Sequence, residues 1–532
     1  MHGRFLTTTT TAAARRHPTI GRRRGGHGHA STNLRARHRM TTSSRLCDVA
    51  TMTPAAASGR GRDGDDASAS ASLRASSRAL EDVRAWSRSV GVRVAPGVDV
   101  RCVDVLRGGD RGSHRGVFAT QDVDAGAMVE LITIPERAMI AARRAADADG
   151  CGGSQDDAYA QDELALELLR HKTRGVRGEF HAYIESMPKS YNLLHSWSEE
   201  EMAALQDARA TVLARERKQD MERAFERVKT TVREILGDSV ASEHDARAAY
   251  VWARDTVSSR AVSVPFHRAG ALTPMGDMFN YAPHDPPVLL DVHGAPMFDA
   301  REDTTETGRS RDADDDAPIP GDGAYVEGVG FTFRSAAQPQ GRRGVRAGEE
   351  IFVCYGEYTN LELLELYGFT LAPDENPQDA YVLDVRVSDA DSAPLKVFVG
   401  GFAWNDLADV RIAIAMKRPR KNEKYLRDIA RRGGALGAEE ELETFEAIRD
   451  AAATALLSFP TTAKADLDTV ESDAFVTMSE NMQLAMTWRL GIKRIIQRAY
   501  KWADARASDA RTATVSAGVA NISLPYVAKG RR

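Results

Sequence analysis

The stretch GEEIFVCYGEYTNLELLELYGF, residues 348–369, decides the fold. Its apolar beginning predicts a strand that ends at Tyr355, and its repeated leucines predict a helix over 360–367. That helix delivers Tyr367 and Phe369 to its far end, beside a glycine. Aromatic side chains at the two ends of such a unit are either core packing or the lining of a ligand site. This stretch alone leaves both interpretations open.

A second informative stretch, LTPMGDMFNY, covers residues 272–281. We expect Met278 and Phe279 to anchor it in a core, which leaves Asp277 and Asn280 as its polar groups. An asparagine amide offers both donors and acceptors, so it suits a purine edge with a neighbouring polar group. The simpler alternative is a local Asx-turn.

The third stretch, SHRGVFATQDVDAG, covers residues 113–126. A turn with a glycine and little side-chain bulk lets backbone N–H and C=O groups approach a ligand closely. Taken alone, an ordinary β-turn explains it as well. The residues around it, 115–120 and 129–134, are predicted to be two strands joined by a turn at Gly126.

The rest of the chain alternates in character. Apolar residues at helical spacing predict a helical block between these segments, and a mainly helical region after them. The polar, acidic stretch between LTPMGDMFNY and GEEIFVCYGEYTNLELLELYGF is interpreted as a solvated surface insertion and not as a metal site. The predicted parts are helices over 80–90 and 160–260, strands over 272–298, 325–333 and 350–354, the acidic insertion 301–322, and helices beyond 380.

In the order in which they occur along the chain, the three stretches resemble the SET-domain pattern, and in particular the Rubisco large-subunit methyltransferase family. Arg260 in WARDTVSSR matches an arginine of that pattern, and FPTT (459–462) and WRLGIKR (488–494) resemble its helical substrate-binding domain. The likeness covers about residues 80 to 505. The chain departs from the pattern at His114, where the family has glycine, and at Tyr281, where it has histidine.

The resemblance implies an α+β fold. A β-rich SET domain with a pseudoknot would span 79–378, with a large helical insertion at about 140–262 and the acidic loop 301–322. An all-α, substrate-binding domain would follow over 379–505, and then a loosely ordered tail, 506–532. It also implies S-adenosylmethionine as cofactor, no metal, and protein-lysine N-methyltransferase activity on a non-histone protein, possibly Rubisco large subunit or a plastid enzyme such as aldolase.

The resemblance further assigns roles to individual residues. Tyr355 would orient the attacking amine, Arg260 would pair with the cofactor carboxylate, and Phe369 would stack on adenine beside Tyr367 at the lysine channel. The remaining cofactor-binding residues would act mainly through their backbone: Ser113, His114, Arg115, Asp277, Met278, Phe279, Asn280 and Tyr281. Removing the proton of a lysine costs about 4 kcal/mol at a pH three units below its pKa. A desolvated channel next to a sulfonium would lower that pKa.

Two rival functions stay open. One is a protein-histidine methyltransferase of the same fold, which Val262 and Gly276 disfavour because they offer no polar group to hold an imidazole. The other is a catalytically idle SET-fold binding protein, which the departures from the pattern at His114 and Tyr281 favour. We expect a monomer that docks its protein substrate on the helical C-terminal domain and binds neither nucleic acid nor membrane.

Composition adds a prediction of location. The chain has 532 residues, 28% of them charged, and a net charge of -5, which is ordinary for a globular protein. Its first 47 residues lack Asp and Glu and are rich in Arg, Ser and Thr, so residues 1–78 are predicted to be a disordered, transit-like segment. A plastid is expected; a mitochondrion, the cytoplasm or the nucleus are the alternatives. Four separated cysteines predict neither a disulfide framework nor a zinc site.

Overall fold

The computed structural model describes residues 65–107, 110–142, 156–284, 297–298, 317–339, 342–418 and 422–516. Most of the predicted transit-like segment, the acidic loop from 301 to 316, and the end of the predicted tail lie outside these residues. No helix among the described residues is long and apolar enough to cross a membrane.

The described chain begins with helix α1 (Asp65–Ser89), which starts well before the predicted Leu80. The residues before Leu80 are rich in alanine, the best helix former, and this extends the helix toward the N-terminus. The apolar face is as predicted, because Leu80 and Val83 are buried. The helix ends before Gly91, whose φ of 90° suits glycine.

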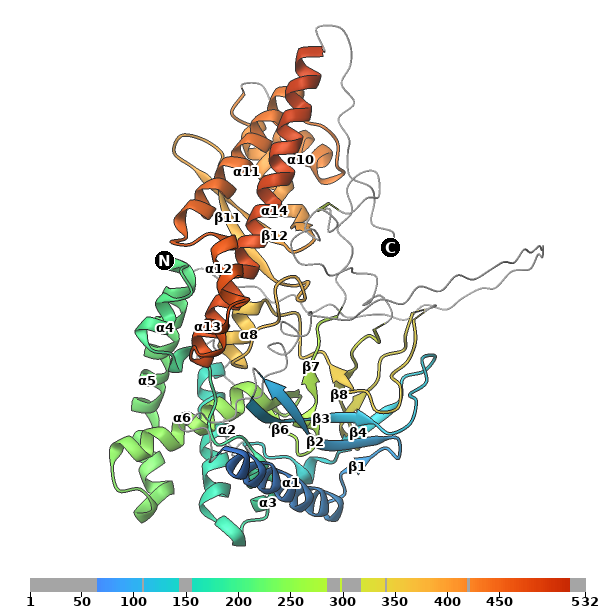
Figure 1. Ribbon diagram of the computed structural model, residues 1–532, viewed down its shortest axis with the longest axis vertical. Coiled ribbons are helices and arrows are strands. Elements are labelled where there is room, and N and C mark those ends of the chain that lie inside the picture. The colour runs from blue at the N-terminus through green and yellow to red at the C-terminus, as the bar shows by residue number, and fades with distance from the viewer. Residues whose placement is uncertain are drawn as a thin grey trace, which may run out of the picture. The chain divides into compact units, whose positions relative to one another are not determined.

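The strands form small antiparallel sheets (Figure 1). The largest has the order β1-β4-β9-β8. Its apolar residues point into one core, as in β4, where every residue after Glu130 is buried. The ribbons β2-β3 and β5-β6 are separate antiparallel pairs. The bounds are β1 (Arg93–Val94), β2 (Val98–Arg107), β3 (Asp110–Ala119), β4 (Glu130–Ile134), β5 (Ala261–Val264), β6 (His267–Leu272), β8 (Asp322–Val326) and β9 (Gly330–Arg334).

A short parallel pair brings remote segments together. Strand β7 (Asn280–Tyr281) pairs with β10 (Phe352–Val353), and Gly321 bridges Val353, also in parallel. On the other side of the same segment, the N–H of Ile351 donates to the carbonyl of Val117 at 2.7 Å. Four stretches of chain therefore meet at β10, which is the kind of crossing that the predicted pseudoknot requires.

The predicted helical insertion is present, and α6 ends at Arg260. The insertion helices are α2 (Asp156–Thr173), α3 (His181–Ser186), α4 (Glu199–Ala203), α5 (Ala208–Leu236) and α6 (Glu243–Arg260). After β10, a capping box of Thr359 and Glu362 starts α8 (Asn360–Leu366), where the leucine spacing predicted a helix.

The C-terminal region is not all-α, so this part of the prediction is wrong. It begins with a three-stranded antiparallel sheet, β11 (Ala380–Arg386), β12 (Ser392–Phe398) and β13 (Gly401–Phe402). Residues alternate between buried and exposed at the end of β11, a period-two signal that the helical pattern around it concealed. The helices that follow are α9 (Trp404–Ala415), α10 (Glu423–Arg431), α11 (Ala438–Ser458), α12 (Ala463–Val470), α13 (Asp473–Val476) and α14 (Glu480–Ser516).

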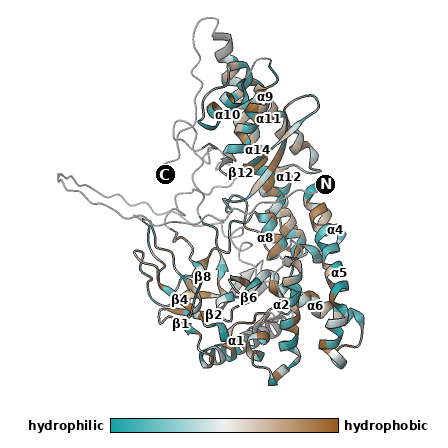
Figure 2. Ribbon diagram, turned by 180° about the vertical axis from the view of Figure 1, so that it is seen from behind, coloured by the Kyte–Doolittle hydropathy of each residue, from teal (hydrophilic) through white to brown (hydrophobic). Residues whose placement is uncertain are grey.

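Helix α14 runs alongside α11 (Figure 1) and continues to Ser516. It therefore includes the first residues of the tail, 506–516, which were predicted to be loosely ordered. Ala503, Ala507 and Ala510 are buried, so the apolar face persists beyond residue 505. Apolar residues gather on the helices and β12 of this region (Figure 2). Its core also includes Leu194 and Trp197 of the insertion, so the two regions share packing.

Candidate active site

Three of the predicted segments converge at the turn η6 (Gly276–Met278) and at β7. The hydroxyl of Tyr355 donates to the carbonyl of Phe279 at 2.5 Å. The amide Nδ2 of Asn280 donates to the carbonyl of Arg115 at 2.9 Å. Nη1 of Arg260 donates to the carbonyl of Asp277 at 3.0 Å. Residues far apart in sequence thus surround one short backbone segment.

Arg260 and Asp277 form a buried ion pair with 3.1 Å between Nη1 and Oδ2, and their side chains are 8% and 1% exposed. The hydroxyl of Tyr183 donates to the same Oδ2 at 2.9 Å, and Nε of Arg260 donates to the hydroxyl of Tyr191 at 3.2 Å. Burial opposes the charge of Arg260, but Tyr191 and Asp277 raise its pKa above the usual value. Arg260 therefore keeps its positive charge.

One atom of this pair has no protein partner. Among the described residues, nothing hydrogen-bonds to the buried Oδ1 of Asp277. A buried carboxylate oxygen without a donor is costly, so its position marks where a ligand's donor would be favourable.

The side chain of Arg115 adds a second, half-buried cation. From the sequence, this residue was assigned only a backbone role. Its Nη1 donates to the carbonyl of Ser186 at 2.6 Å. Burial, and then the charge of Arg260, lower the pKa of Arg115. Together with Asp277, the two guanidinium groups leave a net positive charge, which favours an anionic group such as a carboxylate.

Four aromatic rings named in the sequence analysis meet beside this cluster. The ring centroid of Tyr355 lies 5.3 Å from that of Tyr281 and 5.1 Å from that of Tyr367, and Phe369 lies 6.0 Å from Tyr281. Burial raises the pKa of all three tyrosines, so their hydroxyls stay protonated. The hydroxyl of Tyr281, one of the two residues that depart from the SET-domain pattern, donates to the carbonyl of Gly356 at 3.3 Å.

A fifth ring, Tyr358, was not predicted. Its centroid lies 5.6 Å from that of Tyr367. Gly356 leaves room for the Tyr358 ring, because a Cβ at Gly356 would lie only 2.8 Å from that ring. In the sequence Tyr358 carries no signal of its own, since it falls in a turn between the strand and the helix.

The other predicted residues lie in strand β3 or in the core. Ser113 and His114 lie within strand β3, paired with Asp104 and Val103, so the predicted turn is instead a strand. The side chains of Met278 and Phe279 are buried, as predicted. The ring of Phe279 stacks on Phe333 with 5.0 Å between centroids. These two side chains are therefore part of the core.

Sequence reasoning also missed Glu350. Its Oε1 accepts a hydrogen bond from Nδ2 of Asn280 at 2.6 Å. A Cβ at Gly116 would lie 2.1 Å from the same oxygen, so the glycine makes room for the carboxylate. Asn280 therefore bonds across the fold instead of forming a local Asx-turn. Glu350 also forms an isolated bridge with Phe118.

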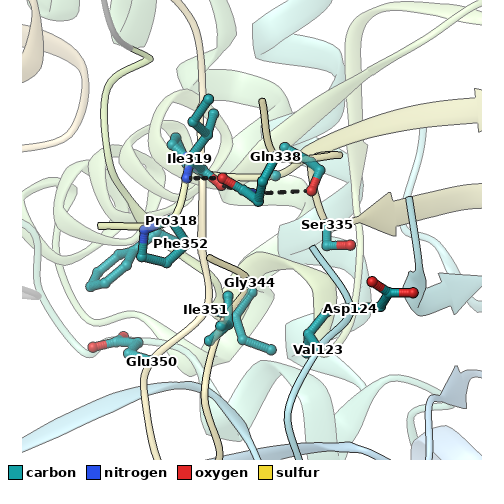
Figure 3. Close-up of a pocket in the computed structure, with 14 residues that line it drawn as sticks. Val123, Asp124, Pro318, Ile319, Ser335, Gln338, Gly344, Glu350, Ile351 and Phe352 are labelled. Carbon is teal, nitrogen blue, oxygen red and sulfur yellow. Dashed lines mark hydrogen bonds between the residues drawn. The ribbon is translucent and has the colours of Figure 1, made fainter. Parts of the chain in front are cut away.

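A small cavity of about 20 Å³ is lined in part by Glu350 (Figure 3). Glu350 and Asp124 lie at opposite ends of the view, and the side chain of Gln338 hydrogen-bonds to the backbone of Ile319. Glu350 both lines this cavity and accepts a hydrogen bond from Asn280. Tyr355 and Asn280 themselves do not line the cavity. No group of His, Cys, Asp and Glu among the described residues is arranged to hold a metal ion.

No protein-family model matches the chain. Among curated proteins, it is 27% identical to protein SET DOMAIN GROUP 40 of Arabidopsis thaliana, over 52% of this chain and 53% of that one. It is 24% identical to the chloroplastic Rubisco large-subunit N-methyltransferase of Nicotiana tabacum, over 72% of this chain and 74% of that one. It is also 24% identical to the chloroplastic fructose-bisphosphate aldolase-lysine N-methyltransferase of Arabidopsis thaliana, over 63% and 66%. The match thus spans about half the length of the first of these relatives.

Two solved structures share the fold. The SET domain of LSMT bound to lysine and AdoHcy superposes with a TM-score of 0.54 at 17% identity, covering 82% of this chain and 93% of that one. Rubisco LSMT bound to AdoMet gives a TM-score of 0.52 at 16% identity, covering 84% and 97%. The predicted α+β SET-domain fold is confirmed by these likenesses.

Proposed function

We propose that this chain is an S-adenosylmethionine-dependent protein-lysine N-methyltransferase that acts on a non-histone protein. The observation that carries the proposal is the convergence of Tyr355, Asn280 and the Arg260–Asp277 pair around one backbone segment. Two relatives named as lysine or Rubisco large-subunit N-methyltransferases support it.

The buried charges fit the amino-acid end of the cofactor. Arg260 and Arg115 would receive its carboxylate, for which a planar guanidinium is well suited. The Oδ1 of Asp277, which has no donor among the described residues, would accept from its ammonium group. When bound, S-adenosylmethionine supplies an electrophilic methyl group on a sulfonium.

The remaining contacts follow from the sequence-derived roles. Backbone groups of Ser113, His114 and Arg115 and of residues 277–281 would hold the cofactor, with Asn280 fixed between Arg115 and Glu350. Phe369 would stack on adenine, and Tyr367 would line the lysine channel. Both rings belong to the aromatic cluster.

Tyr355 would be the catalytic residue. Its hydroxyl proton is engaged by the carbonyl of Phe279, so its oxygen is left to accept from the target amine. A raised pKa keeps this hydroxyl neutral over the working pH range. The surrounding rings exclude water, which favours the uncharged amine that attacks. Holding that amine in line with the methyl group supplies much of the remaining acceleration.

The test is transfer of a tritiated methyl group from labelled S-adenosylmethionine to protein, with Rubisco large subunit, aldolase and a plastid extract as acceptors. We expect transfer, reduced by about a hundredfold or more in Tyr355→Phe because the oriented hydroxyl is lost. Calorimetry should show unchanged binding of S-adenosylhomocysteine by that variant. Amino-acid analysis of the labelled product separates lysine from histidine methylation.

Two outcomes would contradict the proposal. Label on histidine would assign the rival methyltransferase activity. An absence of S-adenosylhomocysteine binding at millimolar ligand would assign the idle binding protein.

We also propose that the enzyme is a monomer located in the plastid and that its substrate docks on the C-terminal region. The word chloroplastic in two relatives' names and the acid-free N-terminal sequence support the location. A fluorescent protein fused after residue 78 should accumulate in plastids; accumulation in mitochondria would favour the alternative location.

A further inference from the structure

A network of buried polar side chains joins α8 to the first residue of β11. Asn360, Asn376 and Asp379 are 1%, 0% and 3% exposed. Nδ2 of Asn376 donates to Oδ1 of Asn360 at 3.0 Å, and Nδ2 of Asn360 donates to Oδ2 of Asp379 at 3.1 Å. Oδ1 of Asp379 accepts from the N–H of Ala380, where β11 begins, at 3.2 Å. The network therefore connects the start of the C-terminal region with α8.

The same network reaches the aromatic cluster through Asn376. Its Nδ2 also donates to the carbonyl of Tyr358 at 2.9 Å. The ring of Tyr358 meets that of Tyr367 edge to face, with 5.6 Å between centroids, and packs against the cluster that contains Tyr281 and Phe369. Asn376 thus holds the backbone of the residue whose ring lies against Tyr367.

The side chain of an asparagine matches this position. An amide side chain has two N–H donors on its nitrogen and an acceptor oxygen. In Asn376 the nitrogen serves Tyr358 and Asn360, and Oδ1 accepts from the N–H of Gln378 at 3.1 Å. A buried polar atom without a partner is costly, so each of these bonds restrains the turn between β10 and α8. That turn is therefore fixed by a side chain from the loop before β11.

We propose that Asn376 is a positioning residue for the lysine channel: it holds the turn at Tyr358 against Tyr367 and ties that turn to the C-terminal region. The inference rests on the proposed function, because it assumes that Tyr367 lines the channel for the target lysine. One buried side chain then links the region on which the substrate is proposed to dock with the channel that receives its lysine.

The contacts of Asn376 predict a selective effect. They go to residues 358, 360 and 378. The groups proposed to hold the amino-acid end of the cofactor, Arg260 and Asp277, bond instead to Tyr191 and Tyr183. Loss of the Asn376 amide should therefore disturb the lysine channel more than it disturbs cofactor binding.

Asn376→Asp tests this selectivity with almost no change of shape. An ionised carboxylate has no donor, so it would face the oxygens of Tyr358 and Asn360 without a hydrogen bond. In the tritium-transfer assay, we expect the KM for the acceptor that the wild type labels, Rubisco or aldolase, to rise about tenfold. Calorimetry should show S-adenosylhomocysteine affinity changed by less than about twofold. Asn376→Ser, whose smaller side chain admits water, should show the same selectivity to a smaller extent.

Hydrogen–deuterium exchange supplies a readout that needs no acceptor protein. Amides that open locally exchange faster, so a loosened turn should show itself in its own peptides. In Asn376→Asp we expect faster exchange over residues 354–370 and unchanged exchange over residues 260–281. The full chain is used in each case, with S-adenosylhomocysteine bound.

Gln338→Glu is the matched control, because it makes the same change from amide to carboxylate at a similar set of bonds. Nε2 of Gln338 donates to the carbonyls of Ile319 and Ala336 at 3.2 and 3.1 Å, and its Oε1 accepts from the N–H of Ile319 at 2.7 Å. None of these partners belongs to the aromatic cluster. We expect this variant to keep the wild-type KM for the acceptor and the wild-type exchange over residues 354–370.

Two kinds of result would overturn the inference while the proposed function stands. Equal weakening for the acceptor and for S-adenosylhomocysteine, or the same response in Gln338→Glu, would mean a general loss of structure. An unchanged KM or unchanged exchange over residues 354–370 in Asn376→Asp would mean that the amide does not hold the turn. If the wild type labelled no acceptor and bound no S-adenosylhomocysteine, the proposed function itself would fail, and the inference about the lysine channel would fail with it.

Discussion

The molecule has two buried carboxylates with similar neighbours, Asp277 beside β7 and Asp466 in α12. They differ in how many of their oxygens accept hydrogen bonds. Both side chains are 1% exposed and both pair with an arginine. The oxygens of Asp466 are both bonded: Oδ1 accepts from Arg489 at 2.7 Å, and Oδ2 accepts from Lys493 at 2.5 Å. The Oδ1 of Asp277, in contrast, has no partner in the described part of the chain.

This difference is the one expected between a structural cluster and the proposed binding site. The Asp466 cluster ties α12 to α14 and reaches the insertion, since Arg489 donates to the carbonyl of Ala204 at 2.7 Å. Burial opposes the charge of Asp466, but hydrogen bonds from Arg489 and Lys493 lower its pKa. Protein groups therefore bond both carboxylate oxygens of Asp466. The Asp277 cluster, whose residue types are almost the same, leaves one carboxylate oxygen for the proposed ligand.

The largest expected effects come from removing the arginine of each cluster. Arg260→Met should weaken binding of S-adenosylhomocysteine by about a hundredfold, because it removes a desolvated partner of the ligand carboxylate. Arg489→Met should instead lower the free energy of unfolding by about 3 kcal/mol, because it leaves Asp466 short of a buried partner. Calorimetry and urea denaturation measure the two quantities.

Both variants should be measured by both methods. Arg260→Met also leaves the buried carboxylate of Asp277 without its cationic partner, so some loss in the free energy of unfolding is expected for this variant. The comparison fails if Arg489→Met weakens ligand binding as strongly as Arg260→Met does in protein that is still folded.

A third buried carboxylate, Asp379, lies where the two regions join and should respond to pH. It accepts from the N–H of Asn360 at 3.0 Å and from that of Ala380 at 3.2 Å. Burial raises the pKa of Asp379 to about 7. The folded state thus holds a proton that the unfolded chain has lost above its ordinary pKa near 4. Stability from this group is greatest at low pH and is lost as the pH rises through 7.

Urea denaturation at pH 5 and pH 8 should therefore show a fall in the free energy of unfolding, of which Asp379 accounts for about 2 kcal/mol. Asp379→Asn cannot ionise, so its curve should be flatter by that amount, whatever its absolute stability. Parallel curves for the two proteins would refute this account of the junction.

The smallest effect is expected at Tyr183, whose hydroxyl donates to Oδ2 of Asp277. Tyr183→Phe should lower the free energy of unfolding by about 1 kcal/mol, the usual net value of one hydrogen bond. Ligand affinity should fall only slightly, because Arg260 still holds the same oxygen. A loss of affinity comparable to that of Arg260→Met would mean that the tyrosine contacts the ligand directly, which calorimetry on this variant would reveal.

Local patterns in the sequence were sufficient to predict most of the helices and strands. The leucines of α8 and the apolar face of α1 follow the period that hydrophobic burial imposes on helices. The same patterns missed β11, β12 and the continuation of α14, because short strands and alanine-rich helices carry weak signals. The motifs also placed Tyr355, Asn280 and Arg260 in one candidate site.

Only the tertiary structure revealed the groups that complete that site. Tyr183 and Tyr191 come from the insertion, and Glu350 meets Asn280 through a strand crossing that joins residues far apart in the chain. Nothing in their local sequence distinguishes them from core tyrosines or a surface glutamate. Period and propensity act over a few residues, whereas the partners of a buried charge depend on which distant segments pack together. For that reason the sequence alone predicted the elements and the central residues, and the packing decided their partners.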